Sequence, residues 1–228
     1  SAFTVGLLHT IACFQGKYLS KEKMAGEACA VEIDKLGAPI GKQDQYAVAY
    51  GGLNYIKFHA DDSVSVAPIV AKSETIKKLQ ESLVMFYTGM THNANKILAE
   101  QKKNISKKEK VKNLLKMCAL TKDMKHSIEN NNLDNIGPIL HESWVKKREL
   151  AGGISNSYID ECYDIACRNG AIGGKLLGAG GGGFLLFYCP KEKQRILEQK
   201  LRLKTFPFRF EHDGSSVIYM GDRYWEEL

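Results

Sequence analysis

Hydrophobic residues recur at helical spacing at the start of the chain. Phe3, Leu7, Ile11 and Phe14 lie three or four positions apart, which places them on one face of a helix. The pattern predicts a helix over residues 1–14.

A second helix is expected over residues 20–36. Ser20 is a favourable N-cap, and Met24 and Val31 contribute to a face that can be buried. Gly37 ends the helix, because glycine is typical of the position after the last helical turn.

An irregular segment and two strands follow this helix. Residues 41–52 are polar and then aromatic, and they end in Gly51 and Gly52, so we expect no regular element there. Residues 55–59 and 63–70 alternate in polarity or are rich in β-branched side chains, which is typical of strands.

After residue 70, the sequence contains both helical and strand patterns. Strands are expected at 83–87, on both sides of a glycine run at 178–183, and at 206–210 and 216–219. Helices are expected at 92–101, 111–128, 133–150, 157–169 and 190–204. Such a mixture indicates the α+β fold class, and the sequence changes character near residue 70, where we place a domain boundary.

Composition and charge narrow the class of protein. The 228 residues are 44% apolar and carry a net charge of +6, which suits one large or two small globular domains. The lysines are spread along the chain, so we expect no nucleic-acid partner, although positive potential favours anionic ligands. No apolar run reaches the length of a membrane span, so we expect no membrane partner. Six cysteines without Cys-x-x-Cys spacing fit a reducing, cytoplasmic compartment.

The glycine run is the strongest candidate for a backbone that binds a ligand. Gly178-Ala-Gly-Gly-Gly-Gly183 lies between two apolar, strand-like runs. Glycine adopts backbone conformations closed to other residues and lets main-chain N–H groups approach a ligand. A flexible linker is the alternative, but linkers are long and polar. We therefore interpret the run as a ligand-facing turn held by a sheet.

Glu32 and Asp44 are the candidate acidic residues. Glu32 lies late in the second expected helix, and Asp44 follows the glycine and proline that end it, so the turn can fold Asp44 back towards Glu32. In phosphoryl transfer one carboxylate can hold Mg²⁺ and another can orient or deprotonate the attacking hydroxyl. A surface helix acid and an ordinary turn residue are the alternatives for Glu32 and Asp44, and local sequence does not decide between them.

Together these segments resemble the GHMP small-molecule kinases, which include galactokinase, homoserine kinase and mevalonate kinase. Residues 178–183 look like the family's C-terminal glycine motif, and Gly41-Lys-Gln-Asp-Gln45 looks like the segment with its catalytic aspartate. The spacing from Glu32 to Asp44 is similar to that in the family, and Ser1-Ala2-Phe3 looks like the exit of its phosphate-binding loop. The resemblance covers essentially the whole chain.

The resemblance implies roles for these residues. Asp44 would be the catalytic base and Glu32 a ligand of Mg²⁺, with ATP as the phosphoryl donor. The residues expected beside the nucleotide or its phosphates are Ser1, Gly180, Gly181 and Gly182. The residues expected to bind substrate are Gln43, Gly178, Ala179 and, from its position in a loop after a strand, Thr91.

Other side chains are interpreted from their positions alone. His92 and Asn93 share the expected substrate role of Thr91, and a polar helix cap is the alternative for all three. Trp144, on an expected helix, is predicted to be part of the core. Lys175 could meet a phosphate, but a lysine at the edge of a strand is usually solvated, and we expect it to lie in solvent.

Within the family, further segments look most like the D-glycero-D-manno-heptose 7-phosphate kinases. These segments are His141-Glu-Ser-Trp144, Gly153-Ile-Ser-Asn156, Gly174 to Phe184 and Pro207-Phe-Arg-Phe210. The implied activity is ATP-dependent phosphorylation of the anomeric hydroxyl of a heptose 7-phosphate, in the biosynthesis of nucleotide-activated heptose for surface polysaccharide. A kinase of fucose, a uronic acid or galactose, and a non-catalytic sugar-binding regulator, are the alternatives.

The resemblance also implies a domain organisation. A ribosomal-S5-like N-terminal domain would occupy residues 1–70, and a ferredoxin-like C-terminal domain residues 71–228. The family's first strands and most of its phosphate loop should precede Ser1. We therefore expect the S5-like domain to be partial and the 228-residue chain to lack kinase activity by itself. The oligomeric state is left open, with a homodimer among the options.

Overall fold

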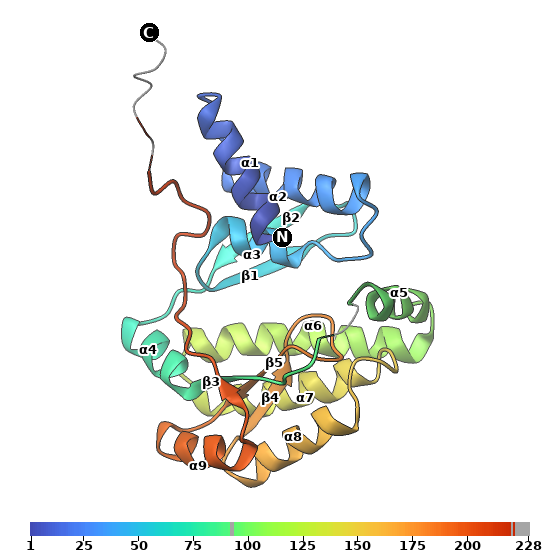
Figure 1. The fold of residues 1–228 in the computed structure, drawn as a ribbon, viewed down its shortest axis with the longest axis vertical. Helices are drawn as coiled ribbons and strands as arrows, with labels where there is room; N and C mark the ends of the chain where they lie inside the picture. The colour runs from blue at the N-terminus through green and yellow to red at the C-terminus, as the bar shows by residue number, and fades with distance from the viewer. Residues whose placement is uncertain (92–93, 220, 222–228) are drawn as a thin grey trace. The chain divides into compact units, whose positions relative to one another are not determined.

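The structure, a computed structural model, describes residues 1–91, 94–219 and 221. The chain divides into two compact units, which we describe separately (Figure 1). Unit 1 comprises Ser1–Pro68 and the segment that begins at Glu211, and unit 2 comprises Ile69–Phe210. The first division lies close to the boundary expected near residue 70. The segment from Glu211, which we had assigned to the second domain, belongs to unit 1 instead.

Unit 1 consists of three α-helices, a π-helical turn and a two-stranded antiparallel sheet. Its core includes Val5, Met24, Ala28 and Ala49, which are buried where the helices meet. Ser20 caps the second helix, since its hydroxyl accepts a hydrogen bond from the N–H of Lys23, as expected for an N-cap serine. The elements are α1 (Ala2–Phe14), α2 (Lys21–Cys29), η1 (Ala30–Lys35), α3 (Gln43–Tyr50), β1 (Asn54–Phe58) and β2 (Val64–Pro68).

Helix α3 corrects one sequence prediction. Residues 41–52 were expected to be irregular, but Gln43–Tyr50 is helical and buries Tyr46 and Ala49. The helix is short, and its acidic start and polar first turn hide the apolar period that would have indicated it. Asp44 therefore lies in the first turn of a helix and not in an open turn.

The segment from Glu211 packs against the end of α3. The N–H of Ser215 bonds the carbonyl of Val48, and the ammonium of Lys21 bonds the carbonyls of Tyr50 and Asp213. A side chain on Gly51 would meet the backbone of Gly214 at 2.1 Å, so glycine is required for this close approach. Among the described residues of 206–219 we find neither of the two strands predicted there, at 206–210 and 216–219.

Unit 2 is built on a four-stranded antiparallel sheet with the strand order β4-β5-β3-β6. In the described part of this unit, six α-helices and a 3₁₀ turn accompany the sheet (Figure 1). The strands are β3 (Leu83–Tyr87), β4 (Gly173–Leu176), β5 (Phe184–Tyr188) and β6 (Lys204–Thr205), and the preceding helix is α4 (Ser73–Ser82). The other helices are α5 (Ala94–Asn104), α6 (Lys108–Glu129), η2 (Leu133–Asn135), α7 (Ile136–Arg148), α8 (Ser157–Arg168) and α9 (Lys191–Leu201).

One face of this sheet forms the main core. Phe86 on β3 and Leu185 and Phe187 on β5 are fully buried, with Trp144 of α7 and Tyr163 of α8 in the same cluster. Side chains alternate between the two faces of a strand, so the neighbouring residues on β3 and β5 lie on the other face. This confirms the predicted core position of Trp144 and the predicted strand at 83–87. Helix α4 had not been predicted.

Of the helices that the structure describes, none is both long and apolar enough to cross a bilayer.

Candidate active site

Glu32 occupies a distortion of the second helix. Helix α2 changes into the π-helical turn η1 at Ala30, and Glu32 is in the first part of that turn. π-Helical turns within helices are uncommon and occur often at functional sites. Glu32 is only 8% exposed, so the surface position that was its alternative is excluded.

Three side chains donate hydrogen bonds to the Glu32 carboxylate. The hydroxyl of Ser1 lies 2.9 Å from one oxygen, and the hydroxyl of Thr4 lies 2.6 Å from the other. The amide of Gln45, from α3, also donates to the oxygen that accepts from Ser1. Ser1 and Thr4 are separated by three positions on the first helix and therefore face the same side.

These contacts fix the ionisation of Glu32. Burial alone would raise the pKa of this carboxyl, but hydrogen bonds from Thr4, from the hydroxyl and the terminal amino group of Ser1, and from Gln45 favour the charged form and lower its pKa to about 2. Glu32 is thus a buried carboxylate that stays ionised at neutral pH, and it lies within hydrogen-bonding distance of a serine hydroxyl.

Asp44 lies next to this cluster but differs from it in environment. Gln45 joins α3 to Glu32, and Asp44 is the residue before Gln45. Asp44 is exposed, and its described partner is the amide of Gln43, which donates to it at 3.2 Å. Its place in the first turn of α3 puts its charge near the positive end of the helix dipole. The fold therefore brings Ser1, Glu32, Gln43 and Asp44 into one region of unit 1.

The glycine run forms a turn between β4 and β5 of unit 2. Four of its residues have positive φ, namely Gly178, Gly180, Gly181 and Gly183, a conformation that other residues rarely adopt. A side chain on Gly180 would meet the backbone of Ile154 at 2.7 Å. The run is thus an ordered turn of a sheet, and the linker alternative does not describe it.

Two neighbouring segments hold the glycine turn in place. The N–H of Gly181 bonds the carbonyl of Ile154, and the N–H of Gly183 bonds the carbonyl of Met90. The hydroxyl of Thr88 donates to the carbonyl of Gly183 at 2.9 Å. Thr91, predicted to bind substrate, is exposed and follows Met90 directly, so it lies beside the turn. His92 and Asn93 lie outside the described residues.

The remaining glycine-motif residues differ in exposure. Gly178 is exposed and Ala179 half-buried, whereas Gly180, Gly181 and Gly182 are buried. Gly181 also lines a groove of about 400 Å³ whose other walls come from α5 and from the loop before α8. The lining residues of the groove are Lys96, Ile97, Gly152, Gly153, Ser155, Asn156 and Gly181.

The sequence-predicted site residues therefore form two groups. Ser1, Glu32, Gln43 and Asp44 belong to unit 1. Residues 178–182 and Thr91 belong to unit 2. Within each unit, the fold gathers residues that are far apart in the sequence.

Sequence reasoning missed three contributors to these groups. Thr4 and Gln45 hold the Glu32 carboxylate, and Thr88 holds the glycine turn. Helical spacing from Ser1 could have indicated Thr4. Gln45 stands next to Asp44 in the motif, but its role depends on the fold of α3.

A divalent cation would find oxygen ligands in unit 1. Among the described residues, no group of three or more His, Cys, Asp or Glu side chains is arranged to hold a metal. The Ser1 hydroxyl and the Glu32 carboxylate nevertheless lie 2.9 Å apart, and Mg²⁺ is typically held by one or two protein oxygens together with phosphate oxygens and water. These two groups fit that type of site.

Comparison with known proteins agrees with these features. Residues 124–206 match the model of the GHMP kinases C terminal family. A D-glycero-alpha-D-manno-heptose 7-phosphate kinase from Campylobacter jejuni is 31% identical over 205 residues, which cover 89% of this chain and 60% of the relative. A bifunctional fucokinase/GDP-fucose pyrophosphorylase from Arabidopsis thaliana is 27% identical over 73% of this chain and 16% of its own length.

A solved structure supports the same fold. A D-glycero-D-manno-heptose 1-phosphate kinase from Bacteroides thetaiotaomicron is 24% identical, superimposes with a TM-score of 0.69, and is matched over 96% of this chain and 62% of its own. The chain thus spans less than two thirds of the length of these relatives. Residues 124–206 are thus similar to the C-terminal domain of the GHMP kinases, and the chain shares the α+β fold of the solved structure.

Proposed function

We propose that the protein containing this chain transfers the γ-phosphoryl group of ATP to the anomeric hydroxyl of a D-glycero-D-manno-heptose 7-phosphate. The observation that carries the choice of substrate is the 31% identity to a heptose 7-phosphate kinase over 89% of the chain. The residue arrangement supports the type of reaction, because phosphoryl transfer is catalysed mainly by positioning and charge stabilisation.

Asp44 is the catalytic base of this proposal. The acceptor hydroxyl attacks the γ-phosphorus, the bond from that phosphorus to the bridging oxygen breaks, and ADP leaves. The proton of the hydroxyl passes to the Asp44 carboxylate. An exposed aspartate at the start of a helix is accessible, as a base for a bound hydroxyl must be.

Glu32 and Ser1 hold Mg²⁺ in this proposal. The ion would neutralise the negative charge that develops on the phosphate oxygens. The hydrogen bonds from Thr4 and Gln45 keep the Glu32 carboxylate ionised and in place. Ser1 precedes α1, so it lies at a helix N-terminus, where N–H groups favour phosphate oxygens.

The glycine turn has the second binding role. In unit 2, the backbone at Gly180, Gly181 and Gly182 is assigned to phosphate binding, with the N–H of Gly181 already held by the carbonyl of Ile154, and Gly178, Ala179 and Thr91 are assigned to the sugar. In unit 1, Gln43 is assigned a role in substrate binding. A cytoplasmic location, where ATP and a reducing environment are available, belongs to the same proposal. The domain assignment to S5-like and ferredoxin-like parts of the fold is also retained as a proposal.

The full-length protein would be tested with ATP, Mg²⁺ and a panel of acceptors. The panel contains heptose 7-phosphate, unphosphorylated heptose, fucose, galactose and a uronic acid. We expect turnover to be highest with heptose 7-phosphate, and ³¹P NMR to show a new phosphate on the anomeric carbon. Preferred turnover of fucose would favour the alternative that the match to a fucokinase supports. No turnover of any sugar, with sugar binding retained, would favour a non-catalytic regulator.

A further inference from the structure

Two lysines beside the glycine turn lie in an unusual environment for their charge. Lys147 is in the last turn of α7, and its ammonium donates a hydrogen bond to the carbonyl of Gly178. Lys175 is on β4, three residues before Gly178. Both side chains are half-buried, although Lys175 was expected to lie in solvent.

The backbone places both lysines on the same side of β4. A side chain on Gly173 would meet the carbonyl oxygen of Gly137 at 2.0 Å, so the start of α7 lies against the Gly173 side of the strand. Lys175 lies on that side too, because alternate residues of a strand share a face. Its cross-strand partner is Leu186.

Helix α7 and strand β4 also run in the same direction. Gly137 lies against Gly173 at one end, and Lys147 bonds Gly178 at the other. Ten helical residues rise about 15 Å, and five extended residues advance about 17 Å, so the two ends match in length. Lys147 and Lys175 are therefore brought to the same end of β4, at the start of the glycine turn.

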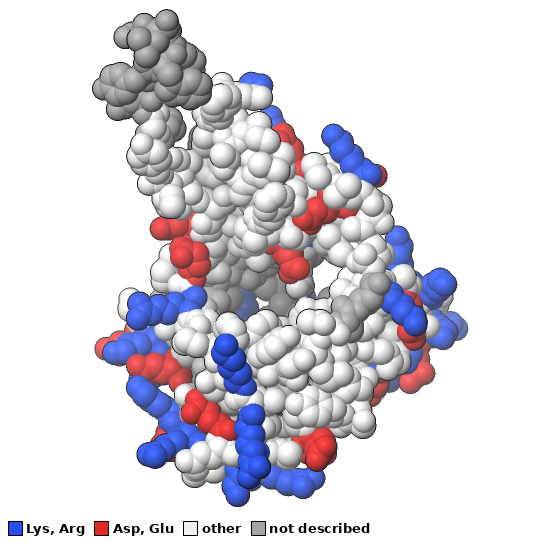
Figure 2. All heavy atoms as spheres, viewed as in Figure 1, with Lys and Arg blue, Asp and Glu red and all other residues white. Residues whose placement is uncertain are grey.

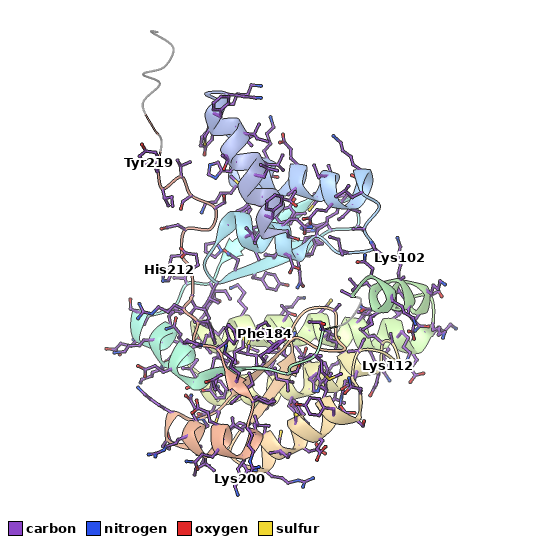
Figure 3. All side chains as sticks on the ribbon, in the orientation of Figure 1. Lys102, Lys112, Phe184, Lys200, His212 and Tyr219 are labelled. Atoms are coloured by element: carbon purple, nitrogen blue, oxygen red, sulfur yellow. The ribbon has the colours of Figure 1, made fainter. Side chains whose placement is uncertain are left out.

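The neighbouring basic residues have carboxylate partners, and these two lysines have none among the described residues. Lys146 pairs with Glu149 at 3.6 Å, and Arg148 pairs with Asp160 at 2.8 Å. Figure 2 shows basic and acidic side chains intermixed on the visible face of unit 2. In the described parts of the chain, neither Lys147 nor Lys175 forms an ion pair with a carboxylate. By contrast, Lys102, Lys112 and Lys200 lie at the periphery of unit 2 in Figure 3.

The two lysines influence each other's ionisation. Burial, together with the smaller effect of the positive charge of Lys175, lowers the pKa of Lys147 to about 8. Burial lowers the pKa of Lys175 as well. Two ammonium groups held close together without a counter-charge are unfavourable, and a bound dianion would relieve both the burial and the repulsion.

We propose that Lys147 and Lys175 bind a phosphoryl group that the acceptor sugar already carries and that is not transferred. This inference rests on the proposed function, because only a phosphorylated acceptor supplies that group. A lysine ammonium binds phosphate as a compact point charge with three N–H donors. The same pair could bind a phosphate of the nucleotide, and the experiment separates these two sources.

The test uses Lys147→Met and Lys175→Met in the full-length protein, with Lys146→Met as the control from the same helical turn. We expect each of the first two variants to raise the KM for heptose 7-phosphate about 10–100-fold, as for the loss of one hydrogen bond to a charged group. In these two variants, the KM for unphosphorylated heptose and the KM for ATP should stay within about twofold of the wild-type values. In the Lys146→Met control, all three KM values should stay within the same range. Lys147→Arg should restore part of the affinity, because it keeps the charge.

Other outcomes would overturn the proposal in different ways. A rise in the KM for ATP, with the acceptor unaffected, would assign the pair to the nucleotide. An unchanged KM for heptose 7-phosphate in folded variants would show that the lysines only stabilise the glycine turn. Retained circular dichroism and thermal unfolding would show that the variants are folded.

A binding measurement keeps this inference separate from the proposed function. Inorganic phosphate would be titrated into the protein while the lysine side-chain NMR signals are followed. We expect phosphate to shift the Lys147 signal and to raise its pKa, and Lys175→Met to weaken that response. If this response is seen in a protein that phosphorylates no heptose, the anion site stands and the proposed sugar is wrong. Heptose 7-phosphate turnover without any response would retain the function and refute the site.

Discussion

The Glu32 carboxylate of unit 1 and the ammonium groups of Lys147 and Lys175 in unit 2 have opposite surroundings for a charged group. Glu32 receives hydrogen bonds from Ser1, Thr4 and Gln45, and its pKa falls to about 2, so the charged form is stabilised. Lys147 and Lys175 have no carboxylate partner among the described residues, and their lowered pKa values mean that the charged form is destabilised.

This difference indicates what each region still requires. A carboxylate that already accepts hydrogen bonds from the protein is oriented to bind a cation. An unsatisfied pair of ammonium groups is a site that an anion would complete. In the proposed kinase, the first region would receive a cation and the second a phosphoryl group.

The largest effect is expected from the exposed acid beside Glu32. Asp44→Asn should reduce kcat about 10²–10⁴-fold, because it removes the proton acceptor while the side chain keeps its size. Fold and ATP affinity should be unchanged, since Asp44 is exposed and has Gln43 as its described partner. Steady-state kinetics and nucleotide binding would be measured, with Asp34→Asn as a control acid from the same unit. Wild-type turnover would show that Asp44 is only a polar residue at the start of α3.

The glycine turn can be tested by comparing two of its own residues. Gly180→Ala should lower the free energy of unfolding by about 2–4 kcal/mol, because the new methyl group meets the backbone of Ile154 and the residue has positive φ. Gly178→Ala should cost only about 1–2 kcal/mol, because its φ is positive but no atom lies within 4 Å of the new methyl group.

Urea unfolding of both variants measures this difference. Equal losses in the two variants would mean that strain at positive φ, and not the contact with Ile154, sets the cost. Gly181→Val is a third variant, in which a β-branched residue would have φ near +79°, and it should abolish turnover while most secondary structure remains.

The Glu32→Gln variant tests whether Glu32 binds Mg²⁺. The Mg²⁺ concentration for half-maximal rate should rise about tenfold, because the amide keeps one oxygen ligand but loses the charge that a hard cation prefers. A Mg²⁺ titration of the rate would measure the shift. An unshifted curve would show that Glu32 orients Ser1 and Thr4 without binding the ion.

The Glu32→Gln variant should also change how the free energy of unfolding depends on pH under acidic conditions. The folded pKa of Glu32 is about 2 and its ordinary value is 4.5, so the carboxylate stabilises the fold fully above pH 4.5. This contribution is lost as pH falls from 4.5 towards 2. Glu32→Gln should therefore lose less stability than the wild type over that interval.

The smallest effect is expected from Lys147→Met in phosphate-free buffer. The folded pKa is about 8 against an ordinary 10.5, so the cost of burying the charge is fully present below pH 8. The free energy of unfolding of the variant should be higher than that of the wild type by about 1 kcal/mol at pH 7, a figure that allows for solvent screening of the charge. This gain should shrink as pH rises from 8 to 10.5. Thermal unfolding at several pH values would measure it. A loss of stability at pH 7 would show that the bond to Gly178 outweighs the burial cost.

Strong local patterns were enough to predict most elements. The period of apolar residues at the start of the chain gave α1, and the apolar run at 83–87 gave β3. The N-cap function of Ser20 was also predicted correctly. Helix α3 was missed because it is short and its first turn is polar. The strands expected at 206–210 and 216–219 were wrong because an alternating pattern forms a strand only where a partner strand is available.

The candidate site was predicted as a set of residues but not as an arrangement. Glu32, Asp44 and the glycine run were identified from residue type, order and the family resemblance. Their roles stay predictions. The contacts of Thr4, Gln45 and Thr88 join segments that the sequence separates, and no local pattern indicates such contacts.

By itself, the sequence determined the α+β class, the membership of residues 178–183 in a turn between strands, and the identity of the acidic residues. These depend on periodicity and on backbone freedom, which are local properties. Only the tertiary structure decided that Glu32 is buried and satisfied, and that Lys175 is half-buried beside Lys147. The physical reason is that the energy of a charge depends on every group around it, and those groups come together only when distant segments pack.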